Sequence, residues 1–102
     1  MHYCFFTAPL SAHLHPKRIL VDAEKPVTLK CNISGFPVDS VTWTKDTKSL
    51  NANSGRVRML TRDILHINSV GREDKGVYQC FVRNSEDSAQ ASAELVLGGK
   101  IA

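Results

Sequence analysis

Hydrophobic and polar residues alternate with a period of two in several separate segments of the chain. The apolar positions of these segments are Val27, Leu29, Cys31 and Ile33; Val41 and Trp43; Leu65 and Ile67; Tyr78, Cys80 and Val82; and Ala91, Ala93, Leu95 and Leu97. A strand with one buried face and one solvated face produces this alternation. No segment keeps a helical period over three turns. The pattern therefore predicts an all-β fold.

Clusters of glycine, proline and small polar residues separate the alternating segments. They fall at 35–37, 51–55, 71–76 and 84–88, and such clusters mark turns. Pro9 and Pro16 bracket the first expected strand, which should be an edge strand because proline is tolerated there more easily than in the middle of a sheet. Many short strands at this spacing predict a two-sheet sandwich.

The cysteines, the tryptophan and one tyrosine fit a specific kind of sandwich. Cys31 and Cys80 both take the inward register of a strand, Trp43 follows Cys31 by twelve residues, and Tyr78 precedes Cys80 by two. With the segment DKGVYQC at 74–80, these residues resemble an immunoglobulin domain, in which an inter-sheet disulfide packs against a tryptophan. The resemblance implies a Cys31–Cys80 disulfide. A catalytic or redox role for Cys31 is disfavoured because an inward position would hide its thiolate.

The same resemblance assigns structural roles to further residues. The expected members of the core and its closing corner are Trp43, Leu65, Asp74 and Tyr78. The Tyr78 hydroxyl should bond to backbone at the corner that Gly76 permits. Asp74 is expected to form an ion pair with Arg56 or Arg58 that closes the base of the sandwich, although such a pair could also look like a functional site.

The link between Leu50 and Arg56 is too short for two extra strands. This favours the intermediate (I-set) type of immunoglobulin domain over the antigen-receptor variable type. We therefore predict an I-set, two-sheet sandwich over residues 7–99. Residues 1–6 are expected to be an N-terminal extension or linker, and residues 100–102 a C-terminal tail or linker.

Length, charge and hydropathy narrow the class of protein. The chain has 102 residues, 42% of them hydrophobic, which suits one domain with a real core. Its net charge is +3 and its basic residues are scattered, which disfavours nucleic-acid binding. No apolar stretch approaches the roughly 20 residues that span a bilayer, so no membrane insertion by this segment is expected. The N-terminus lacks a signal peptide's features, and we expect a segment of a longer secreted or membrane-anchored protein.

Two outward positions are candidates for function. Asn32 begins the sequon Asn32-Ile33-Ser34, and we expect it to carry a glycan that blocks its sheet as a flat protein contact. Phe81 should face outward on the opposite sheet, beside Gln79 and Arg83, because its neighbours face inward. An exposed aromatic beside an arginine has the composition of an interface hot spot. The alternative is that a loop or the N-terminal segment covers Phe81.

Other reactive residue types give weaker signals. His13 and His15 lie on one side of a strand, but two ligands make a weak metal site, and we expect solvent-facing imidazoles. Cys4 is left outside the expected disulfide; it could be free, cross-link two copies or be buried in the intact protein. No catalytic triad, paired carboxylate cleft or phosphate loop is evident. We expect a binding module that needs no cofactor or metal, and not an enzyme.

Three segments resemble one particular family of receptors. They read TAPLSA at 7–12, KGVYQCFVRN at 75–84 and ASAELVLGG at 91–99. Together they are similar to the Down syndrome cell adhesion molecule (Dscam) family, most of all to the fourth immunoglobulin domain of an arthropod member. The resemblance covers about residues 7–99 and leaves Cys4 unexplained.

The resemblance implies a large extracellular receptor that functions in neuronal self-recognition and, in arthropods, in immunity. Its first four domains fold back as a horseshoe in which the fourth packs on the first. The expected partners are other immunoglobulin domains of the same receptor, or the same receptor on another cell. Two alternatives remain: an immune recognition domain that binds foreign ligands, and an intracellular muscle-type structural domain, which normally has no disulfide.

Overall fold

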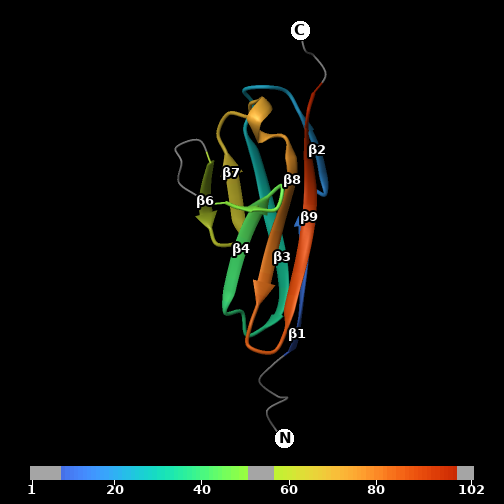
Figure 1. Cartoon of the computed structure of the whole chain (residues 1–102), viewed down its shortest axis with the longest axis vertical. Helices are drawn as coiled ribbons and strands as arrows, with labels where there is room; N and C mark the ends of the chain where they lie inside the picture. Colours follow the sequence, from blue (N-terminus) through green and yellow to red (C-terminus); the bar gives the residue numbers. More distant parts are fainter. Residues whose placement is uncertain (1–7, 51–56, 99–102) are drawn as a thin grey trace, which may run out of the picture.

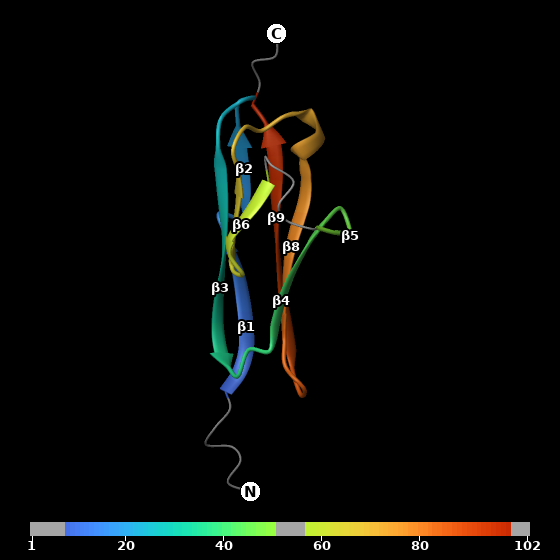
Figure 2. The same ribbon diagram turned by 90° about the vertical axis from the view of Figure 1, so that its left-hand side faces the viewer.

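The computed structural model describes residues 8–50 and 57–98, which form two packed β-sheets (Figure 1). Turned by 90°, the sheets stand as two layers (Figure 2). One sheet has the strand order β1 (Ala8–His15), β3 (Val27–Phe36), β7 (Ile64–Ile67), β6 (Val57–Thr61). The other has the order β2 (Arg18–Val21), β9 (Ser88–Leu97), β8 (Gly76–Arg83), β4 (Ser40–Lys45), β5 (Lys48–Ser49). The predicted all-β sandwich is confirmed.

The inward positions of the alternating segments fill the space between the sheets. Among the most deeply buried side chains are Leu29, Cys31, Trp43, Leu65, Ile67, Tyr78, Cys80, Val82 and Leu95. The predicted disulfide joins Cys31 of β3 to Cys80 of β8 across the two sheets, with 6.4 Å between their Cα atoms. Burial of this apolar surface is the main source of the fold's stability.

A further strand, which the sequence pattern did not predict, follows the first expected strand and belongs to the other sheet. β1 pairs antiparallel with β3, whereas β2 pairs parallel with β9. Pro16 lies between them, and because proline lacks an N–H it cannot continue a ladder. The chain then crosses to β9, where Glu94 N donates to Lys17 O at 2.9 Å. β1 is an edge strand, as the prolines predicted.

One extra strand precedes the link to the four-stranded sheet. β5 pairs with β4 through only two residues. Asp46 and Thr47, with φ of 50° and 70°, make the turn between them. The sequence predicted that the link between Leu50 and Arg56 is too short to hold two further strands. Residues 51–56 of that link lie outside the described residues.

The corner before β8 contains the tyrosine hydrogen bond that the sequence predicted. The Tyr78 hydroxyl donates to Asp74 O at 2.5 Å. The Asp74 carboxylate, in the short 3₁₀ helix η2 (Arg72–Asp74), accepts a hydrogen bond from Gly71 N at 2.8 Å. Asp74 is 4% exposed. Its ion pair stays a prediction, since Arg56 lies outside the described residues and Arg58 is an exposed residue of β6.

Candidate functional site

The candidate interface residues share the outer face of the five-stranded sheet. Gln79, Phe81 and Arg83 alternate on β8 with the buried Tyr78, Cys80 and Val82. Because β8 lies between β4 and β9, each of the three is flanked on both sides by a neighbouring strand. The outward orientation predicted for these residues is confirmed, and we call this surface the β8 face.

The centre of the β8 face is uncharged. Phe81 lies opposite Thr42 on one side and Gln90 on the other. Thr44 Oγ1 donates to Gln79 Oε1 at 3.4 Å. Phe81 is half-buried among these short side chains rather than fully exposed. Covering neutral polar groups costs less free energy than covering charged ones, so the centre of this face suits a protein contact.

Charged and apolar groups lie at the margins of the β8 face. Arg18 Nε and Glu94 Oε1 form an ion pair at 3.3 Å, and both side chains are exposed, so it contributes little to stability. Leu20 is 70% exposed on the edge strand β2, and its register partner Val96 is half-buried. Beside Phe81 the surface is hollowed by a depression of about 410 Å³ that Arg83 and Gln90 help to line.

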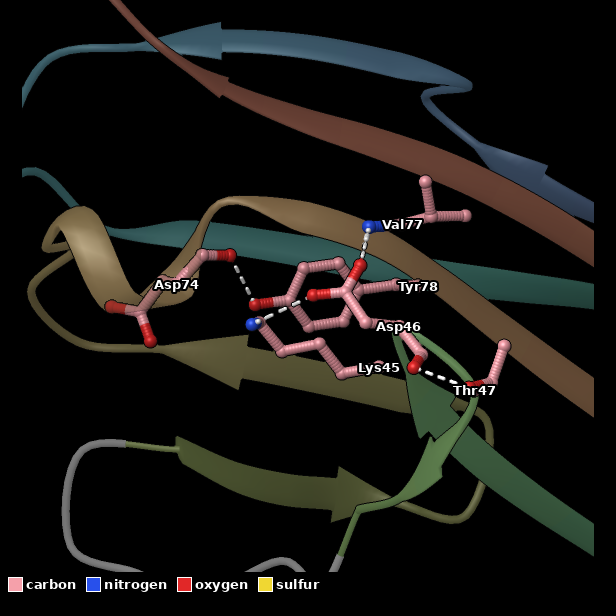
Figure 3. A network of polar contacts seen from close by, with 6 residues as sticks. All are labelled: Lys45, Asp46, Thr47, Asp74, Val77 and Tyr78. Carbon is pink, nitrogen blue, oxygen red and sulfur yellow. Dashed lines mark hydrogen bonds and ion pairs between the residues drawn. The ribbon is translucent and has the colours of Figure 1, made fainter.

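A clasp at the β4–β5 turn holds the start of β8 (Figure 3). Asp46 Oδ1 accepts a hydrogen bond from Val77 N at 2.9 Å, and Asp46 N donates to Val77 O at 2.8 Å. Lys45 Nζ lies 3.3 Å from Asp46 Oδ2. A Cβ at Gly76, whose φ is +150°, would stand 2.5 Å from that carboxylate. The clasp therefore requires glycine at this position.

The clasp also changes the titration of Asp46. The Val77 backbone N–H, and then the Lys45 ammonium, lower the pKa of this carboxyl below its ordinary value. Both contacts favour the ionised form. Sequence reasoning missed Asp46, because the residues that it bridges are 31 positions apart along the chain.

A second polar anchor holds the opposite end of β8. Asn84 Oδ1 accepts hydrogen bonds from the backbone N–H groups of Glu86 and Asp87, both at 2.8 Å. Asn84 Nδ2 donates to Pro37 O at 2.9 Å, and Asp87 Oδ2 accepts from Leu10 N at 2.9 Å. An asparagine that opens a polar turn is a recognisable Asx-turn signal. It could have identified this anchor from the sequence.

The sequon lies on the other side of the sandwich. Asn32 is exposed on β3, in the four-stranded sheet, where it pairs with the exposed His13 of β1. A glycan there would leave the β8 face uncovered. His15 is also exposed, and no group of three or more metal-ligating side chains occurs in residues 8–50 and 57–98. Within those same ranges no helix is long and apolar enough to cross a bilayer.

Comparison with known families settles the type of domain. The Immunoglobulin I-set domain family matches residues 11–97. The chain belongs to the immunoglobulin I-set family. The predicted I-set type is thereby confirmed, and the β8 face is a surface of an I-set domain.

The I-set domain has close relatives among adhesion proteins. It is 46% identical over 94 residues to the cell adhesion molecule Dscam1 of Drosophila melanogaster, covering 92% of this chain and 4% of that protein. It is 35% identical over 81 residues to Contactin-1 of Bos taurus, covering 79% of this chain and 8% of that protein. The predicted similarity to the Dscam family is confirmed. The chain spans only a small part of each relative.

Solved structures give the same result. The I-set domain superposes with a TM-score of 0.80 and 46% identity on a structure of the eight N-terminal immunoglobulin domains of Dscam, covering 92% of this chain and 11% of that one. Against the four N-terminal domains of a Dscam1 isoform the TM-score is 0.78, again at 46% identity, covering 90% of this chain and 21% of that one. The chain therefore corresponds to one domain within a tandem array in those structures.

Proposed function

We propose that this I-set domain is an extracellular module of a Dscam-type adhesion receptor and binds another immunoglobulin domain through its β8 face. Its similarity to Dscam1 and Contactin-1 supports a place in an adhesion receptor. The Cys31–Cys80 disulfide is a feature of oxidising compartments. That disulfide argues against the intracellular muscle-type alternative. In this proposal the domain is a binding module, not an enzyme, in a receptor of neuronal self-recognition or arthropod immunity.

The partner in this proposal is an immunoglobulin domain of the same receptor, on the same or another cell. Similar chains occur in solved arrays of four and of eight such domains, so neighbours of this class are expected. We place the domain fourth in its array, folded back against the first, because of the family resemblance described above. The domain itself would span residues 7–99, which the family match over 11–97 supports.

The contrast between the two sheet faces carries the proposal. The β8 face presents Phe81 in a neutral surround, with Gln79 and Arg83 on either side along the strand. The opposite face bears the exposed sequon residue Asn32, which we propose is glycosylated. A glycan prevents flat contact on its own face, so the β8 face is the one left for a protein partner.

Sedimentation velocity with a matched pair of variants tests this function. Phe81→Ser removes the central aromatic ring, and Leu60→Ser removes an apolar side chain that is 54% exposed on β6. Each is measured alone over a concentration series, and within a fragment that contains the domain's own neighbouring domains. We expect Phe81→Ser to abolish a dimer of the isolated domain, or to lower the sedimentation coefficient of the folded-back fragment. Leu60→Ser should change neither.

Either result for Phe81→Ser, loss of the dimer or a less compact fragment, would show that the β8 face is a contact surface. A dimer would show a homophilic contact, and a compact fragment would show an intramolecular one. If Phe81→Ser and Leu60→Ser behave alike in both experiments, the β8 face is not the contact and the proposal fails.

A further inference from the structure

The outer face of the four-stranded sheet has an unusual charge distribution. None of the ten acidic residues of the chain lies on β1, β3, β6 or β7. Basic and imidazole side chains do lie there, at outward positions. They are His13, His15, Lys30, Arg58 and His66. We call this set the cationic row.

Strand register places the members of the cationic row beside one another. His15 of β1 pairs with Lys30 of β3, and Arg58 of β6 pairs with His66 of β7. Side chains directly opposite each other in antiparallel strands lie about 5 Å apart. The row crosses all four strands of the sheet, a width of about 14 Å at the usual strand spacing. Between β3 and β7 the two pairs are offset by two residues, since Lys30 lies opposite Ile64 and His66 opposite Thr28. The row is therefore two neighbouring pairs spread over the four strands.

The nearest polar neighbours leave the charge of the row intact. Thr28 Oγ1 lies 2.9 Å from His66 Nδ1, and a hydroxyl can donate to a neutral imidazole or accept from a protonated one. Asn32, opposite His13, is neutral. Asp63 lies in the β6–β7 turn beside Arg62, and its carboxylate is bonded to Thr61. No carboxylate therefore pairs with the row from its own strands.

We propose that the cationic row is a docking surface for a sulfated polysaccharide. A linear polyanion carries sulfates at short intervals and so matches a line of cations across a flat sheet. The three histidines add N–H donors that can bond to sulfate oxygens, beside the permanent charges of Lys30 and Arg58. The choice of an extracellular polyanion rests on the extracellular placement proposed above.

A glycan on the sequon would affect access to this surface. A glycan on Asn32 would stand beside His13 and cover one end of the row. The glycan-free chain is therefore the form that presents the whole surface. Chain produced in bacteria, with its disulfide formed, carries no N-linked glycan and is the form to test.

Binding to immobilised heparin, with desulfated heparin as the control surface, tests the proposal. We expect binding at 0.15 M salt that weakens steeply with added salt, because cation–polyanion contacts release counterions. Lys30→Ser with Arg58→Ser should weaken binding about tenfold. The matched control, Lys48→Ser with Lys75→Ser, removes the same charge at exposed sites elsewhere and should change it less than about twofold.

Three outcomes would each overturn the proposal: equal loss of binding in the Lys30/Arg58 and the Lys48/Lys75 double variants, equal binding to desulfated heparin, or no binding at 0.15 M salt. A failure here with the Phe81→Ser result intact would remove the polysaccharide site alone and leave the adhesion function standing.

Discussion

Trp43 shows how one side chain links the two sheets. It is 2% exposed, and its indole Nε1 donates to Arg62 O, in the β6–β7 turn of the opposite sheet, at 3.0 Å. The ring therefore contributes buried apolar area and also satisfies a backbone carbonyl. A buried polar group that loses its partner costs additional free energy.

Replacing this ring should be the most damaging single apolar truncation in the core. We expect Trp43→Ala to lower the free energy of unfolding by about 3–5 kcal/mol, because it leaves a cavity and an unpaired carbonyl. Denaturant melts followed by circular dichroism measure the loss. A loss below about 1 kcal/mol would mean that the structure collapses onto the site or that the ring is not part of the core.

Asp46 gives the stability a specific dependence on acid. Its pKa in the folded state is lowered by the Val77 backbone N–H and by Lys45, so the clasp stabilises the fold above the ordinary value of 3.8 and loses that contribution as the pH falls below it. The free energy of unfolding of the natural chain and of Asp46→Asn should therefore differ at pH 7 and converge toward pH 2. A difference that stays constant across this range would exclude the ionised carboxylate as the cause.

The disulfide acts at the scale of the elements, since it ties β3 to β8 across the sandwich. The two cysteines are 49 positions apart, and closing a loop of that length stabilises the native state by about 4 kcal/mol in the loop-entropy model. Reduction of Cys31–Cys80 should therefore lower the unfolding midpoint far more than Cys4→Ser does. Comparable effects of the two changes would contradict the pairing.

How much could be predicted from sequence differs between the elements. The two-residue period predicted the outward side of β8 correctly, because a strand's parity is fixed once Cys80 faces inward. The sequence pattern did not predict β2, which pairs with a different sheet from β1. Only Ile19 and Val21 of its four residues face inward, and so short a pattern cannot reveal the parallel pairing with β9. Phe81 was expected to face outward, either exposed or covered by a loop or the N-terminal segment, and it is half-buried. Its flanking residues come from strands distant in the sequence.

At the scale of the whole molecule, the sandwich separates two chemically different faces. The β8 face is neutral at its centre, around Phe81, whereas the four-stranded sheet carries the sequon and the cationic row. The ends differ as well: β1 begins at one end of the sandwich and β9 finishes at the other (Figure 1). A domain in a tandem array would then have its sequence neighbours at the two ends and keep the β8 face available for a further partner.

Site-specific photo-crosslinking tests the central claim, that the β8 face contacts another immunoglobulin domain. A benzophenone amino acid would replace Phe81 in the receptor ectodomain, with replacement of Leu60 on the opposite sheet as the control. The account predicts that illumination links position 81 to a peptide of another immunoglobulin domain and gives no such product at position 60. Crosslinks formed equally from both positions, or from position 60 alone, would contradict it.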